Sequence, residues 1–438
     1  IHALNILSTI KDTTMTEMTD SGMWIEVSSP FCGIASDDLS IKVDGNTVTV
    51  IGNGDAVTKK GFETPITDMS PRVKGKAVSL KHAVTHIADL LRTSKQPVIA
   101  GMATDLNGAR SAMALADKSR ATVDSMDSTA SFRNTLVLQD TGWMVTTLTE
   151  VRNRVDLLLV VGSDIEADYP RFYERMVWNE ESMFDQDIES REVVYLGKAP
   201  SGDSSTSPQG KKAQVISCDD ADLPEVMSVL RALVKGKNIQ AEQVGGITVT
   251  VLKILAEQLK QAKYSVVVWS AASLDFDHAE TTVQTLCEMV KDLNLTTRSN
   301  GLPLGGKEGS ITANQVSAWQ SGFPMRTNFN RGYPDYDPYL SDTNRMLAAD
   351  EVDILLWISS FNIDRTPPKS NAKTIVLGRS GMAFEQEPEV FIPVGTPGID
   401  HVGRAFRSDG VVSVPLRKLR DSGLPSTFDV LTAVEQAL

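Results

Sequence analysis

The stretch Ser29-Pro30-Phe31-Cys32-Gly33-Ile34-Ala35-Ser36-Asp37-Asp38 lies near the start of a chain of 438 residues. Ser29, Cys32 and Ser36 are separated by two and three residues, with a proline and a glycine between them. This is the outline of an iron-sulfur cluster loop, in which several thiolates converge on iron. Only one of the three positions is a cysteine, and a single thiolate cannot hold a cluster. The chain is therefore a redox enzyme, the remnant of one, or neither.

The composition is that of an ordinary globular protein, with 41% hydrophobic and 23% charged residues. The length predicts roughly two to four folding units with a large core. A formal charge of -13 argues against a general nucleic-acid role, and no run of about 18 apolar residues predicts a membrane span. The three cysteines, Cys32, Cys218 and Cys287, show no pairing pattern. This favours a reducing compartment, by default the cytoplasm.

The chain divides into four expected parts. Residues 1–19 read as a disordered or non-native leader, because the chain does not begin with Met. Residues 20–70 predict a small β-rich unit whose hairpin turns at Asp44-Gly45-Asn46. The remainder alternates apolar strands, such as Val155–Gly162 and Ile354–Ile358, with amphipathic helices. Such alternation is typical of parallel sheets covered on both faces. We expect two α/β layered domains, residues 71–245 and 246–438.

Several local patterns leave their function open. Several strands end in Gly or small polar residues, as at Gly101 and Gly162. Such strand ends can bind phosphate, but glycine there more often serves only to form a turn. His82 and His86 are spaced as a zinc pair would be, but no third ligand is near, so a surface pair is favoured. The aromatic segment 301–338 is either a cofactor-binding loop or an interface arm.

Several co-linear motifs resemble the B-type subunit of formylmethanofuran dehydrogenase, a molybdopterin oxidoreductase with a dimethylsulfoxide-reductase-like fold. The resemblance runs from about residue 24 to the end. It rests on the stretch 29–38 and on the following segments: Gly162-Ser163-Asp164-Ile165-Glu166-Ala167-Asp168-Tyr169-Pro170-Arg171, residues 314–324, Arg331-Gly332-Tyr333-Pro334, residues 392–399 and residues 403–410.

The departures from that family affect each of its cofactors. The resemblance implies cysteines at Ser29 and Ser36, a fourth cluster ligand near Asp55, and a metal-binding cysteine within 129–134, where this chain has none. It also implies Gly-Ser-Asn-Pro where Gly162-Ser163-Asp164-Ile165 stands, and a carboxylate there repels the phosphates of a pterin nucleotide. We therefore expect neither an iron-sulfur cluster nor molybdopterin.

The sequence is also similar to the B-type subunit of the formyltransferase/hydrolase complex of methylotrophic bacteria. That resemblance implies a non-catalytic scaffold beside hydrolase, formyltransferase and small subunits, in a complex that converts formyl-tetrahydromethanopterin to formate through a methanofuran-like carrier. The alternative is an active, molybdopterin-dependent formylmethanofuran dehydrogenase subunit. The vacated cofactor groove could hold the carrier's polyglutamate tail, since arginine binds carboxylates through paired hydrogen bonds. The candidate tail-binding residues are Arg133, Arg171, Lys198, Lys307, Arg326 and Arg331.

Overall fold

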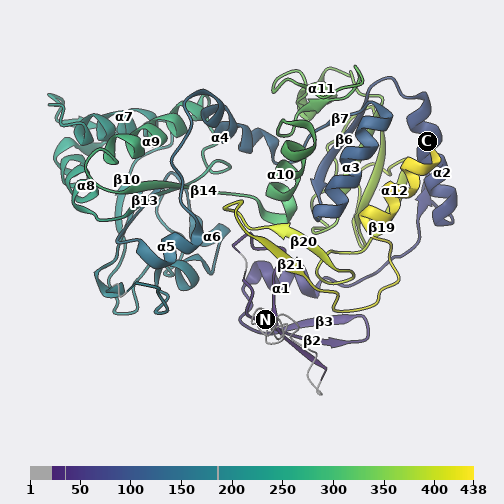
Figure 1. Ribbon diagram of the computed structural model, residues 1–438, viewed down its shortest axis with the longest axis horizontal. Helices are drawn as coiled ribbons and strands as arrows, with labels where there is room; N and C mark the ends of the chain where they lie inside the picture. The colour runs from purple at the N-terminus through teal and green to yellow at the C-terminus, as the bar shows by residue number, and fades with distance from the viewer. Residues whose placement is uncertain (1–21, 35, 185–186) are drawn as a thin grey trace, which may run out of the picture.

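The structure is a computed structural model that describes residues 22–34, 36–184 and 187–438. Two α/β lobes lie side by side above a small β-rich unit (Figure 1). The expected leader, residues 1–19, lies outside the described residues. Within the described chain, no helix is both long and apolar enough to cross a membrane.

The N-terminal unit is a three-stranded antiparallel sheet with one helix. Asp44 pairs with Thr47, so the predicted hairpin turn is confirmed, and Gly45 at its tip has φ +57°. Asp55 accepts a hydrogen bond from the Thr58 N–H and so caps the helix. The elements are β1 (Met23–Val27), β2 (Leu39–Asp44), β3 (Thr47–Gly52) and α1 (Ala56–Glu63).

The larger lobe is built on a nine-stranded sheet in the order β16-β15-β7-β6-β17-β18-β19-β4-β5. Its five central strands are parallel, and antiparallel pairs extend both edges. The strands are β4 (Arg72–Val73), β5 (Lys76–Ala77), β6 (Pro97–Ala103), β7 (Thr122–Val123), β15 (Thr327–Asn328), β16 (Asp335–Tyr336), β17 (Ile354–Ser359), β18 (Lys373–Arg379) and β19 (Val390–Val394).

Side chains of these strands alternate between two cores. Leu356 and Ile358 pack against one group of helices, whereas Leu355 and Trp357 lie in a separate cluster on the other face with Met346. The first face is covered by α2 (Leu80–Thr93), α3 (Leu106–Ser119), α10 (Ser310–Ser321) and α12 (Thr427–Ala437), and the second by α11 (Thr343–Ala348) (Figure 1). The hairpin of β20 (Gly403–Phe406) and β21 (Ser413–Leu416) crosses toward the smaller lobe.

The smaller lobe has a five-stranded parallel sheet in the order β10-β9-β8-β13-β14. Leu159 and Val161 face one helix layer, and Leu158 and Val160 face the other. The strands are β8 (Leu157–Val161), β9 (Glu192–Gly197), β10 (Gln214–Ser217), β13 (Ser265–Ser270) and β14 (Ser299–Leu304). A short hairpin pairs β11 (Gln243–Val244) with β12 (Ile247–Thr248). The helices are α4 (Ser128–Asp140), α5 (Leu148–Arg154), α6 (Ile165–Asp168), the π-helix Tyr173–Val177, α7 (Leu223–Val234), α8 (Val249–Gln261) and α9 (Ala279–Leu293); 3₁₀ turns span Ile188–Ser190 and Lys307–Gly309.

The two sheets do not follow the expected division at residue 245. The smaller lobe pairs β8 with β13, and the larger lobe pairs β6 with β17, so each sheet takes strands from both sides of that residue. The physical reason is that strand pairing is non-local, whereas the expected boundary rested on the order of elements along the chain. Each lobe is instead completed by a segment distant in sequence.

Candidate functional site

The loop 29–38 is closed by its own hydrogen bonds. The Ser29 N–H donates to the Ser36 carbonyl at 2.8 Å, and the Cys32 Sγ donates to the Ser36 Oγ at 3.4 Å. The Ser29 Oγ lies 3.5 Å from the Thr58 Oγ1, and the Asp55 carboxylate accepts from the Thr58 N–H at 2.7 Å. The residues at or near the positions where the resemblance implies cluster ligands are therefore engaged in folding the loop and starting α1.

Side chains of this loop enter more than one core. Phe31 packs edge-on against Phe62 of α1, at 5.2 Å between ring centroids, and against Phe361 after β17, at 6.0 Å. Cys32 and Ile34 are buried in the core of the smaller lobe. Cys32 is therefore a small buried side chain of this core. The loop thus joins the N-terminal unit to both lobes.

Arg171 fixes the other end of the loop. Its guanidinium donates to both Asp38 carboxylate oxygens at 2.7 and 2.9 Å, to Glu174, and to the Asn53 carbonyl. Burial opposes ionisation of Asp38, but Arg171 and Arg175 outweigh it and hold the pKa of that carboxyl below its usual range. Arg171 is therefore a buried clamp between the N-terminal unit and the smaller lobe.

The Asp38 contact predicts a pH-dependent stability. We expect Asp38→Asn to lower the free energy of unfolding by about 1 kcal/mol at pH 7, the upper range for a partly exposed ion pair. Because the folded-state pKa lies below the ordinary value of 3.8, this contribution is present above that value and is lost as the pH falls through the folded pKa. Urea unfolding of wild type and variant from pH 7 to pH 3 measures it.

The exposed neighbour Asp37, which pairs with Arg175, provides the matched control. Asp37→Asn should change the free energy of unfolding by less than about 0.5 kcal/mol at pH 7. A deficit for Asp38→Asn that stays constant between pH 7 and pH 3 would contradict the assignment.

The loop after β14 meets the larger lobe beside the loop 29–38. Gly309, with φ +83°, leaves no room for a side chain, since a Cβ would lie 2.2 Å from the Thr104 carbonyl oxygen. Glu308 has φ +52° and accepts a hydrogen bond from the Asn362 side chain at 2.9 Å. Burial raises the pKa of Glu308. Lys307 binds Asp168 at 2.8 Å and lies 4.6 Å from the centre of the Tyr169 ring.

A second charged cluster lies at the start of α4, where the resemblance places a metal-binding cysteine. Arg326 donates to the Ser128 hydroxyl and lies 4.4 Å from the centre of the Phe132 ring. It also pairs with Asp342 and lies 3.8 Å from Asp124. Burial raises the pKa of Asp124 to about 6. These contacts fix the segment 324–342 against β7 and α4.

The six predicted cations are dispersed, and each already has a carboxylate partner. Arg171 and Lys307 lie near the loop 29–38, Arg133 lies on α4, Arg326 contacts the first residue of α4, Lys198 follows β9, and Arg331 is exposed. Their partners are Asp38 and Glu174 for Arg171, Asp168 for Lys307, Asp275 for Arg133, Asp124 and Asp342 for Arg326, Asp220 for Lys198, and Asp335 for Arg331. Carboxylates of a ligand would have to displace these internal carboxylates.

Backbone donors near the carboxyl ends of β8 and β9 are also taken by carboxylates. The buried Glu166 accepts hydrogen bonds from the N–H groups of Ser204 and Ser205, at 3.3 and 2.7 Å. Asp164 caps α6 by accepting from the Ala167 N–H. Phosphates of a nucleotide bind at such positions in open α/β sheets. The residues present here do not fit a pterin nucleotide, just as the loop 29–38 does not fit a cluster.

No group of three or more His, Cys, Asp or Glu side chains among the described residues has the geometry to hold a metal ion. His86 contacts Glu389 at 2.9 Å, and His82 is exposed on the same helix.

Sequence reasoning missed the ion pair between Asp127 and Arg365, which lies beside the start of α4. The signal for it was weak, because the two residues are far apart in sequence and belong to no motif.

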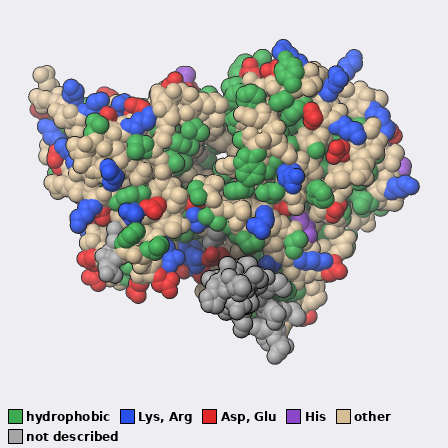
Figure 2. Space-filling model, viewed as in Figure 1, with side chains coloured by type: hydrophobic (Ala, Val, Ile, Leu, Met, Phe, Trp, Pro, Cys, Tyr) green, Lys and Arg blue, Asp and Glu red, His purple; other side chains and the backbone are tan. Residues whose placement is uncertain are grey.

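The aromatic segment has both buried and exposed side chains. Phe329 is buried, whereas Trp319 on α10 and Tyr333, Tyr339 and Leu340 after it are 59%, 53%, 71% and 57% exposed. Figure 2 shows hydrophobic side chains gathered over the α10–α11 region, beside the hollow between the lobes. Exposed clusters of Trp and Tyr are typical of protein interfaces. Of the two alternatives, the exposure favours the interface arm.

Comparison with known proteins places these features in a family context. No family model matches the chain. The B-type subunit of tungsten-containing formylmethanofuran dehydrogenase 2 from Methanocaldococcus jannaschii is 27% identical over 412 residues, 90% of this chain and 93% of that protein. The B-type subunit of the formyltransferase/hydrolase complex Fhc from Methylorubrum extorquens is 29% identical over 358 residues, 79% of this chain and 90% of that protein.

Comparison with solved structures agrees with the sequence comparison. The crystal structure of the formyltransferase/hydrolase complex FhcABCD from Methylorubrum extorquens with methylofuran superposes with a TM-score of 0.70 at 26% identity, covering 84% of this chain and 98% of that chain. Acetylene hydratase from Pelobacter acetylenicus shares the fold alone, with a TM-score of 0.57 at 7% identity, covering 94% of this chain and 70% of that chain. The fold is thus the predicted dimethylsulfoxide-reductase-like α/β fold. The chain is homologous to the B-type subunits of formylmethanofuran dehydrogenase and of Fhc.

Proposed function

We propose that this chain is a non-catalytic subunit of a formyltransferase/hydrolase complex in one-carbon metabolism. The observation that carries the proposal is the loop 29–38, where Ser29, Cys32 and Ser36 bond to one another or to α1 while Phe31 and Ile34 fill cores. The loop therefore acts as a packing element. The homology with the B-type subunit of Fhc and the exposed aromatic arm support assembly with hydrolase, formyltransferase and small subunits.

The proposed complex uses a methanofuran-like carrier, because the similar FhcABCD structure contains methylofuran. In this proposal the carrier delivers a formyl group to the hydrolase, and formate is released without redox chemistry. Binding of a polyglutamate tail to this chain is a finer proposal. It requires exchange of the internal partners of Arg133 and Lys307 for carboxylates of the tail. The three cysteines are free thiols, which keeps the cytoplasm as the proposed compartment.

The experiment is purification of the native complex through a tag on this chain, followed by elemental analysis and identification of the co-purifying chains. We expect hydrolase and formyltransferase subunits in constant ratio, and far less than one equivalent of molybdenum, tungsten or iron bound to this chain. Stoichiometric tungsten or molybdenum would overturn the proposal and support the alternative, an active formylmethanofuran dehydrogenase subunit. This alternative names a definite activity, because the chain is 27% identical to the B-type subunit of tungsten-containing formylmethanofuran dehydrogenase 2.

A further inference from the structure

The hairpin of β20 and β21 lies across the boundary between the two lobes (Figure 1). Among the described residues its two strands pair only with each other. The Phe406 N–H at the end of β20 donates to the Thr312 hydroxyl at 2.8 Å, and the Phe406 ring lies 5.3 Å from the Trp319 ring. Thr312 and Trp319 both belong to α10. The larger lobe therefore carries this hairpin.

The tip of the hairpin reaches the smaller lobe through polar contacts. The Asp409 carboxylate accepts a hydrogen bond from the Leu148 N–H at 3.0 Å, and Arg407 donates to the Thr149 hydroxyl at 3.4 Å. Leu148 and Thr149 are the first two residues of α5. The Asp409 side chain is completely buried and also pairs with Arg407. One buried carboxylate thus links the hairpin to the smaller lobe.

Few apolar contacts hold this hairpin in place. Ala405 and Leu416 are buried, but none of residues 403–416 belongs to a hydrophobic core cluster of the described chain. Val411 at the tip is 62% exposed. The Ser408 Oγ is buried with no hydrogen-bond partner among the described residues, and water would satisfy it once the tip moved. Two-stranded hairpins are marginally stable alone, and segments with few buried apolar contacts open at the lowest free energies.

The hairpin closes the space beside the loop 29–38. About 10 Å³ remains between the hairpin, Gly33 of that loop, and Gly306 and Gly309 after β14, which is room for at most one water molecule. Gly309 lies against Thr104, directly after β6. The space is therefore at the carboxyl edge of the larger sheet, where ligands of open α/β sheets usually bind. A larger molecule can enter it when the hairpin moves.

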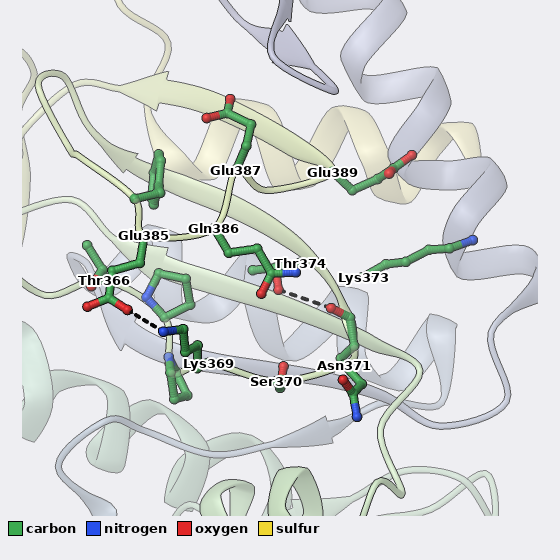
Figure 3. A pocket seen from close by; sticks show the side chains of 14 residues that line it. Thr366, Lys369, Ser370, Asn371, Lys373, Thr374, Glu385, Gln386, Glu387 and Glu389 are labelled. Atoms are coloured by element: carbon green, nitrogen blue, oxygen red, sulfur yellow. Dashed lines mark hydrogen bonds and ion pairs between the residues drawn. The ribbon is translucent and has the colours of Figure 1, made fainter.

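The opposite edge of the same sheet is open instead. A cavity of about 440 Å³ lies at the amino ends of β18 and β19, where Lys369 and Glu385 pair at 2.8 Å across it (Figure 3). Both of these side chains are largely exposed, so solvent reaches this cavity. The two edges thus differ in access, and the closed edge is the one that the hairpin crosses.

We propose that the β20–β21 hairpin is a releasable strap. When it is closed, it ties the larger lobe to α5 and seals the space between the loop 29–38 and Gly306. When the Asp409 carboxylate leaves the Leu148 N–H, the tip moves away and a ligand can reach that space. This inference rests on contacts within the chain and does not depend on the proposed function.

A buried thiol in the strap would report its opening. Ala405 lines the sealed space and is 7% exposed, so an Ala405→Cys variant of the full chain should react with N-ethylmaleimide when the strap opens. Cys287, which is 2% exposed in the core of the smaller lobe, is the internal reference, because its thiol reacts after a much larger unfolding. Mass spectrometry follows both sites. We expect the introduced thiol to react roughly tenfold faster than Cys287, or more, in the folded protein.

The tip contact is tested by adding Asp409→Ala to the Ala405→Cys variant. Labelling of the introduced thiol should become about tenfold faster, which corresponds to one lost hydrogen bond to a charged group, and labelling of Cys287 should not change. Ser413→Ala is the matched control in the same hairpin, because its hydroxyl contacts Arg404 rather than the smaller lobe. With that control, labelling should stay within about twofold of the parent variant.

Thr149→Ala removes the contact of Arg407 from the side of α5 and should speed labelling about threefold. It keeps the test valid if Asp409→Ala misfolds, which circular dichroism would reveal. An introduced thiol that reacts no faster than Cys287 would overturn the proposal. Equal acceleration of both thiols by a folded tip variant would overturn it as well, because the variant would then act on global stability rather than on the strap.

Discussion

Replacement of Arg420 by methionine is expected to lower the free energy of unfolding by about 3–5 kcal/mol, because it leaves a buried carboxylate without its counter-ion. Arg420 and Asp400 are each 2% exposed, and the guanidinium donates to the carboxylate at 2.7 Å. Arg420 also donates to the Asn46 carbonyl in the hairpin between β2 and β3. The variant should therefore weaken the attachment of the N-terminal unit to the larger lobe. Urea unfolding monitored by circular dichroism measures the loss.

Two further variants separate the buried charge from the loss of side-chain volume. Replacing both members of a buried pair with apolar residues is often close to neutral, so Asp400→Leu combined with Arg420→Met should recover part of the stability lost by Arg420→Met alone. Lys418→Met removes an exposed lysine paired with Asp421 and should change stability by less than about 0.5 kcal/mol. A loss for Arg420→Met no larger than that of Lys418→Met would contradict the prediction.

The local elements could be predicted because their signals are local. The helix of residues 80–93 has its apolar positions, Ala83, Val84 and Ile87 among them, on one face, and the structure buries that face. The strands Leu157–Val161 and Ile354–Ser359 are near-continuous apolar runs, and both are central strands of parallel sheets. Sheet membership was not predictable in this way. β8 and β13 pair across more than a hundred residues, and nothing in either strand specifies the other.

The candidate site shows the same limit. The sequence located the loop 29–38 and singled out Arg171, but it could not show that Arg171 binds Asp38 across 133 positions of chain. The sequence predicted a cation-lined groove because it shows the cations of the former cofactor loops but not the carboxylates that pair with them. In the structure the nearby carboxylates are paired with those cations, because a partly buried guanidinium without a counter-ion is costly. Composition alone cannot distinguish a vacant cation cluster from a set of satisfied ion pairs.

The second large effect is expected at Phe31. Phe31→Ala should lower the free energy of unfolding by about 3–5 kcal/mol, the usual cost of removing a buried aromatic side chain. Phe31 is 2% exposed and contacts Phe62 in the N-terminal unit and Phe361 in the larger lobe, with Arg379 5.8 Å above its ring. Because Cys32 is left in place, the variant tests the packing of the loop rather than its one thiol. Urea unfolding gives the stability, and hydrogen exchange locates the loosened segments.

The matched control is Phe428→Ala on α12, which removes the same atoms from a side chain that is 43% exposed and should cost less than about 1 kcal/mol. If the loop were only the remnant of a cluster site, Phe31→Ala would behave like this control, and hydrogen exchange would change only locally. If the loop joins the lobes, protection should fall in β2 and β3, around Phe361, and in the core of the smaller lobe that holds Ile34. That second pattern would show that the shape of the loop supports the packing of two cores, which requires no metal.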